Sequence, residues 1–158
     1  MDTVNVFGAE WREFSSALAL TLSGMQAPGF LVIDAPSGVY ARFHMNNFRS
    51  WCEVVHNSQL DEKYRMPEQA EARLRRQGWS APVEGKSVNW YRTVAWPAHY
   101  RGYELVADEV TAALHQGLNV RAPADLDIQS WIEDSEDVFL VDALLAATGH
   151  GDQATADL

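Results

Sequence analysis

The chain of 158 residues has one cysteine, Cys52, and only 12 lysine and arginine residues against 22 aspartate and glutamate residues. A single cysteine excludes an internal disulfide and any metal site that needs several thiolates. The formal net charge of −10 argues against nucleic acid, because binding phosphates requires a basic face. No apolar run approaches the ~20 residues of a membrane span, and the amino terminus lacks the pattern of a signal peptide. We therefore expect a cytoplasmic protein that binds neither nucleic acid nor a membrane.

Sequence motifs of catalysis and of metal binding are also missing. The chain has no Gly-rich phosphate loop, no serine elbow and no HExxH pair. The acidic segment 125–137 has carboxylates at several EF-hand positions, but Ser130 stands where the turn of a calcium loop needs glycine. A solvated acidic segment is expected there. We predict no catalytic residue, no cofactor and no metal site, although paired carboxylates of an enzyme would leave no local spacing to detect.

Periodic apolar residues predict the order of the structural elements. Spacings of three and four indicate helices over residues 8–25, 67–77 and 98–116, and a short amphipathic helix over 138–147. Apolar runs and alternation predict strands over 30–33 and 88–96 and a hairpin over 39–55. The length and a hydrophobic content of 47% suit one core, hence a single domain over residues 1–147 with a disordered polar tail over 148–158. The predicted class is α+β: a twisted antiparallel sheet with helices packed on one face, in the order α-β-β-β-α-β-α plus a C-terminal helical extension.

The hairpin can be given a register. Asn46 and Asn47 predict a two-residue turn, because asparagine tolerates the positive φ of a type I′ turn. This turn places Arg42 directly opposite Trp51. One face of the hairpin is then apolar, and Cys52 on that face is expected to be a buried, inert thiol.

The other face of the hairpin is the candidate contact surface. It carries the contact candidates Tyr40, Arg42, Trp51 and Glu53, and alternation also places His44, Arg49 and Val55 there, an amphipathic mixture. An arginine opposite a tryptophan is attracted by the ring, and Tyr, Trp and Arg are enriched in interfaces. Two other interpretations stay open: a helix covers this face, or it is an ordinary half-solvated face of the sheet.

The most distinctive stretch joins a helix end to an aromatic strand. Gly78 after an arginine-rich turn predicts that the helix ends at about Gln77, and Pro82 prevents its resumption. Trp79 is expected to fold back on the last helical turn. Trp79 and Trp90 are further candidates for contact with a partner, in a groove for apolar side chains. The alternative is that both lie in the core, where each would bury ~150–250 Å².

The order of elements, together with a motif of eight residues, carries a family resemblance. The motif consists of Leu74, Gly78-Trp79, Pro82 and Asn89-Trp90-Tyr91-Arg92. With it the chain resembles the TY-Chap family, bacterial domains related to type III secretion chaperones and to YbjN proteins, over approximately residues 11–117. The resemblance implies a small α+β domain without cofactor or catalysis that binds peptide segments or partly folded clients. It also implies a possible homodimer, since type III secretion chaperones are commonly dimers.

The sequence therefore favours a non-enzymatic, chaperone-like or adaptor protein with a polypeptide partner. Two alternatives from other classes remain. An immunity or antitoxin protein would use its acidic surface to cover a basic toxin. A small-molecule-binding or hydrolytic α+β domain would show a pocket with a perturbed acid or base.

Overall fold

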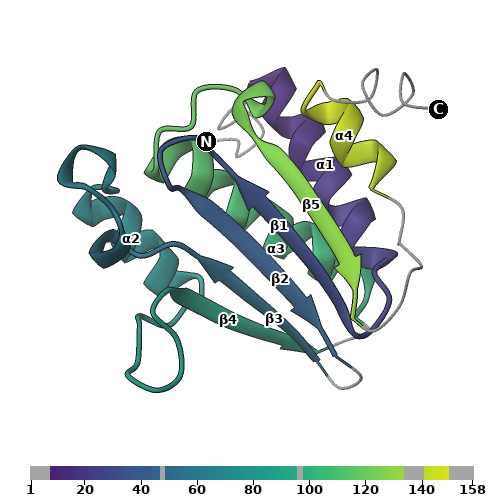
Figure 1. Ribbon diagram of the computed structural model, residues 1–158, viewed down its shortest axis with the longest axis horizontal. Coiled ribbons are helices and arrows are strands. Elements are labelled where there is room, and N and C mark those ends of the chain that lie inside the picture. Colours follow the sequence, from purple (N-terminus) through teal and green to yellow (C-terminus); the bar gives the residue numbers. More distant parts are fainter. Residues whose placement is uncertain (1–7, 47–48, 96–97, 134–140, 150–158) are drawn as a thin grey trace.

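A five-stranded antiparallel sheet forms the centre of the molecule, in a computed structural model that describes residues 8–46, 49–95, 98–133 and 141–149 (Figure 1). The strand order is β4-β3-β2-β1-β5. The strands are β1 (Gly29–Asp34), β2 (Tyr40–Met45), β3 (Arg49–Val54), β4 (Trp90–Ala95) and β5 (Asp127–Ile132). The predicted α+β class with an antiparallel sheet is confirmed.

Helices form a layer on one side of this sheet. Helix α1 (Ala9–Ser23) and helix α3 (Tyr100–Ala112) pack together behind the strands, and α4 (Asp142–Ala147) packs on α1 (Figure 1). A π-helical turn, η4 (Ala113–Gly117), continues α3 and contacts α2 (Glu68–Arg76). Short 3₁₀ turns complete the list: η2 (Asn57–Gln59), η3 (Glu62–Tyr64) and η5 (Pro123–Asp125). None of the helices in the described segments has the length and hydropathy of a membrane span.

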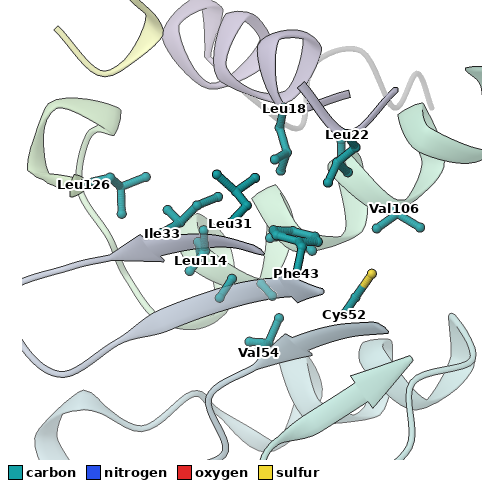
Figure 2. Packing of buried hydrophobic residues seen from close by; sticks show 14 of the residues in the cluster. Leu18, Leu22, Leu31, Ile33, Phe43, Cys52, Val54, Val106, Leu114 and Leu126 are labelled. Atoms are coloured by element: carbon teal, nitrogen blue, oxygen red, sulfur yellow. The ribbon is translucent and has the colours of Figure 1, made fainter. Parts of the chain in front are cut away.

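The core lies between the sheet and this helix layer (Figure 2). Apolar side chains alternate along the strands, so that every second residue of β1, β2 and β3 points toward the helices. The buried residues labelled in Figure 2 are Leu31, Ile33, Phe43, Cys52 and Val54 from the strands, and Leu18, Leu22, Val106, Leu114 and Leu126 from the facing segments. The helices therefore cover one face of the sheet. The other face carries the alternate residues of the strands, which are mostly polar or aromatic.

The end of α2 agrees with its prediction. Gly78 has a positive φ of 97°, its N–H donates to the carbonyl of Arg75 at 3.1 Å, and the N–H of Trp79 donates to the carbonyl of Leu74 at 3.0 Å. These two bonds are those of a Schellman motif, which glycine permits because it has no Cβ. The helix ends at Arg76 with Gln77 as its C-cap. The backbone of Trp79 returns to the last turn through its bond to Leu74, while its indole bonds to Glu109 of α3.

The predicted register of the hairpin is wrong by two residues. Arg42 lies opposite Glu53, and Trp51 lies opposite His44. The cause is the position of the turn. The N–H of Asn46 donates to the carbonyl of Arg49 at 3.1 Å, and its side-chain oxygen accepts from the N–H of Arg49 at 2.9 Å, so the pairing continues one residue further than predicted. A shift of two keeps the described side chains of β2 and β3 on their predicted faces, because the side-chain period of a strand is two. Val55, predicted on the face away from the core, is buried just after β3.

The prediction of a solvated acidic segment over 125–137 is wrong for residues 127–132, while residues 134–137 lie outside the described ones. Residues 127–132 form β5, which pairs with β1 along its whole length. The alternation is present, with Ile128 and Ile132 toward the core. Asp, Gln and Ser disfavour strands in general, but pairing with a neighbouring strand and burial of one face override that preference. The predicted element order is corrected by this additional edge strand.

The carboxyl-terminal predictions are covered only in part. Helix α4 occupies the second half of the predicted segment 138–147, whose first residues lie outside the described ones. Thr148 is buried and hydrogen-bonded to the carbonyl of Leu144, while residues 150–158 of the predicted tail also lie outside the described ones.

Candidate functional site

The face of the sheet that points away from the helices is the candidate site, and it is called the open face here. No described helix lies in front of it in Figure 1. Register and alternation place on it residues from all five strands. They are Phe30, Val32, Asp34, Tyr40, Arg42, His44, Arg49, Trp51, Glu53, Tyr91, Thr93, Asp127, Gln129 and Trp131.

A row of rings crosses the open face at right angles to the strands. Trp131, Phe30, His44 and Trp51 are successive partners across β5, β1, β2 and β3. Trp131 stacks on Phe30 with ring centroids 5.0 Å apart and planes at 11°, and Phe30 stacks on His44 at 4.3 Å and 5°. Trp51 stacks instead on Tyr91 of β4, at 4.9 Å and 9°. The rings thus form two stacks, one of Trp131, Phe30 and His44 and one of Trp51 and Tyr91. The four successive partners Trp131, Phe30, His44 and Trp51 are called the ring row.

A hollow of about 440 Å³ lies where the two stacks meet. It is lined by Phe30, Arg42, Phe43, His44, Trp51, Glu53 and Trp131. Phe43 points its side chain into the core on the other side of the sheet, so the walls of the hollow are the rings of Phe30, His44, Trp51 and Trp131, with one arginine and one carboxylate beside them. Such a mixture of large apolar area and a few polar groups is typical of binding sites.

Hydrogen bonds hold the polar part of the open face in place. The Tyr40 hydroxyl donates to the side-chain oxygen of Asn89 at 3.0 Å, and the amide of Asn89 donates to Glu53 at 3.0 Å. Ser87 donates to the same oxygen of Glu53 at 3.0 Å. Arg42 lies 3.5 Å from Glu53 and has its guanidinium 5.2 Å from the centroid of the Tyr40 ring. Asn89 is fully buried, so it links these side chains to the interior of the fold.

Two carboxylates face each other at one end of the open face. Asp34 is the direct partner of Asp127 across β1 and β5. Partial burial raises the pKa of Asp34, and the charge of Asp127 raises it further, while Arg42 lowers it. Like charges directly opposite each other destabilise a sheet. This end of the face is therefore electrostatically strained and favours positive charge.

The structure brings four of the predicted contact residues together and separates two. Tyr40, Arg42, Trp51 and Glu53 all lie on the open face. The expected pairing of Arg42 with Trp51 is wrong, because Arg42 lies opposite Glu53 and its guanidinium lies over the ring of Tyr40. Trp79 and Trp90 lie in the core, 3% and 0% exposed, in agreement with the alternative interpretation. We leave both out of the candidate site.

The aromatic half of the site was missed by sequence reasoning. His44 was placed on the correct face but not considered as a contact residue, and Phe30 was assigned only to a short strand. Trp131 lies in the segment that was taken as acidic and solvated. The missing signal was the alternation along residues 127–132, which identifies an edge strand and with it one end of the ring row.

The single cysteine lies away from the candidate site. Cys52 is buried on the helix side of the sheet, where desolvation raises the pKa of its thiol to about 12, despite a lowering by Arg92. No group of three or more potential metal ligands is present among the described residues.

The comparison with known proteins agrees with this geometry. The family model TY-Chap3, described as "T3SS (YopN, CesT) and YbjN peptide-binding chaperone 3", matches residues 5–132, which is most of the chain and includes all five strands. Comparison with curated proteins and with solved structures finds no match. The family match extends beyond residue 117, where the resemblance by element order ended, through the last residue of β5. The chain therefore belongs to the TY-Chap3 family of T3SS and YbjN peptide-binding chaperones.

Proposed function

We propose that this protein is a non-enzymatic chaperone-like or adaptor protein that binds a polypeptide segment on its open face. The observation that carries the proposal is the ring row with its hollow, on a sheet face that no described helix covers. Membership of a family of peptide-binding chaperones supports a polypeptide as the ligand.

The energetics of the open face suit such a ligand. Trp131 is 42% exposed, and large apolar rings that remain in contact with water gain free energy when a partner covers them. Tryptophan and tyrosine are frequent among the residues that dominate binding energy in interfaces. The hydrogen bonds of Asn89 with Tyr40 and Glu53 hold the polar side chains in one arrangement, which lowers the entropy lost on binding.

Substitution of the rings tests the proposal. Trp51→Ala and Trp131→Ala should each weaken binding of a peptide selected from a random library by roughly tenfold, as loss of a dominant contact residue does. Binding would be measured by calorimetry. Leu20→Ala is the matched control, because Leu20 is 55% exposed but lies on α1 in the helix layer. Equal affinity of all three variants and the parent would refute the proposal.

The same experiment separates the other function classes. A globular basic protein that binds with the same dependence on Trp51, when no flexible peptide does, would identify an immunity or antitoxin protein. A small organic ligand that saturates the hollow and excludes peptides would identify a small-molecule-binding domain.

Two further parts of the proposal concern the cell and the assembly. We propose a cytoplasmic location, as the sequence predicts, and a homodimer, which the resemblance implies. Sedimentation of the parent and of Trp131→Ala tests the homodimer, since a dimer formed through the open face would dissociate in this variant.

A further inference from the structure

We propose that the open face selects segments in which an aromatic side chain and a basic side chain are four residues apart. The aromatic side chain would enter the hollow of the ring row, and the basic side chain would reach Asp34 and Asp127. This inference rests on the proposed function and adds the chemistry of the partner.

The spacing follows from the strands themselves. Phe30 and Asp34 are four residues apart on β1, and Trp131 and Asp127 are four residues apart on β5. Because a strand rises by about 3.4 Å per residue, the ring row and the acid pair are separated by about 14 Å along the sheet. An extended peptide that lies along β1 has the same rise, and its residues four apart point to the same side. One such peptide can therefore occupy both places at once.

The charge of the face points to a basic side chain. Asp34 and Asp127 are direct partners, and the Tyr40 hydroxyl beside Asp34 in the register donates to Asn89. Arg42 is the cation that lowers the pKa of Asp34, but its guanidinium is also 3.5 Å from the carboxylate of Glu53. An arginine or lysine of the partner would relieve the repulsion between the two carboxylates, whereas an acidic side chain would increase it.

The geometry of the hollow points to an aromatic side chain. Trp51 stacks on Tyr91, while His44 stacks on Phe30, and members of both stacks line the hollow. A planar ring from the partner would find ring faces and edges on both sides, which adds to the free energy of area burial. The negative charge of the chain as a whole, −10, attracts the same basic segments from a distance.

A mutant cycle tests the inference. The probes are three synthetic extended peptides with a tryptophan, and with arginine, glutamine or glutamate four residues from it, each made in both orders along the chain. Asp34→Asn together with Asp127→Asn should weaken binding of the arginine peptide roughly tenfold and leave the glutamine peptide within about twofold, since paired charges contribute in this range. Both substitutions remove a repulsion, so the variant should fold.

The control variant changes the net charge by the same amount as the double aspartate variant, but on the helix side of the molecule. Glu10→Gln together with Glu13→Gln removes two exposed carboxylates from α1, on the helix side, and should leave the preference for arginine over glutamine unchanged. Equal binding of the arginine and glutamate peptides, with affinity still dependent on Trp51 and Trp131, would overturn this inference and leave the proposed function standing. Absence of binding for every peptide would overturn both.

Discussion

The indole N–H of Trp79 donates a hydrogen bond of 3.0 Å to the carboxylate of Glu109, which is buried on α3. Arg92 of β4 donates to the same carboxylate oxygen, and also to the carbonyl of Gln77 at the end of α2 at 2.8 Å. One carboxylate thereby connects α2, β4 and α3. The Trp and Arg of the motif that carried the family resemblance thus hold the fold together behind the open face.

Removal of this carboxylate should be costly. Glu109→Ala should lower the free energy of unfolding by about 3 kcal/mol, because Arg92 and the indole of Trp79 would lose their acceptor in a buried place. Urea denaturation followed by tryptophan fluorescence measures the change. Glu109→Leu combined with Arg92→Met is the control and should recover a large part of the loss, since no charge remains unpaired. A loss below ~1 kcal/mol for the single variant would contradict this account.

The helix stop at Gly78 makes a second prediction. Gly78→Ala should cost about 1–2 kcal/mol, because an L-residue is disfavoured at a φ of 97°. No heavy atom lies within 4 Å of the added Cβ among the described residues, so the cost is that of the backbone alone. Gly102→Ala in α3 is the control of opposite sign. Its Cβ would lie 3.5 Å from Ala98, an ordinary contact, and alanine should stabilise the helix by up to ~1 kcal/mol. Thermal unfolding of the two variants measures both signs.

The local signals of the sequence predicted most of the fold. Gly78 determines where α2 ends through its own backbone, and alternation along β2 and β3 gave the correct faces of the hairpin. Strand β5 could not be recognised in the same way. Its local signal is the alternation along residues 127–132, but the polar residues of this segment have little preference for a strand until β1, about a hundred residues earlier, pairs with them.

The candidate site also has a part that local sequence patterns predict and a part that depends on the pairing of distant strands. The polar residues Tyr40, Arg42 and Glu53 lie on one hairpin, so local alternation sufficed to group them. The ring row joins Trp131 to Phe30 and His44 through the pairing of β5 with β1, which depends on the whole fold. The cross-strand partners of Arg42 and Trp51 depend on the position of the hairpin turn. A turn that is displaced by one residue changes the partner of every residue in the hairpin.

The tryptophans of the core and of the open face should differ sharply in their effect on stability. Trp90→Ala should cost about 3–5 kcal/mol, because this side chain is fully buried. Trp131→Ala should cost less than about 1.5 kcal/mol, mainly through its stacking on Phe30. Chemical denaturation of both variants measures the difference. Similar losses would show that Trp131 serves the fold, and would weaken its assignment to the contact surface.

The thiol of Cys52 should be inert in the folded protein. A rise of its pKa from 9.0 to about 12 reduces the thiolate fraction at mildly alkaline pH roughly a thousandfold, and burial blocks access as well. A chromogenic disulfide reagent should therefore label the native protein slowly and the urea-unfolded protein at the rate of a free thiol. Rapid labelling of the native protein would show that the sheet opens readily at β3.

The opposition of Asp34 and Asp127 makes the stability depend on pH in a defined direction. A carboxyl whose pKa is raised in the folded state binds its proton more tightly there than in the unfolded chain. The penalty for its ionisation is therefore complete above the folded pKa and disappears as the pH falls toward the ordinary value of 3.8. Asp34→Asn should raise the free energy of unfolding at neutral pH by roughly 0.2–1 kcal/mol, the usual cost of like charges across two strands. The difference between variant and parent should vanish in acid.

Denaturant titrations at neutral and at acid pH measure this difference, with Asp61→Asn as the control. Asp61 is an exposed carboxylate before η3, far in sequence from both strands, and its replacement should leave the pH dependence unchanged. Greater stability of the parent at neutral pH would mean that the attraction of Asp34 to Arg42 exceeds its repulsion by Asp127. The acid pair would then already be compensated within the chain, and the argument for a basic partner residue at this end of the open face would lose its electrostatic basis.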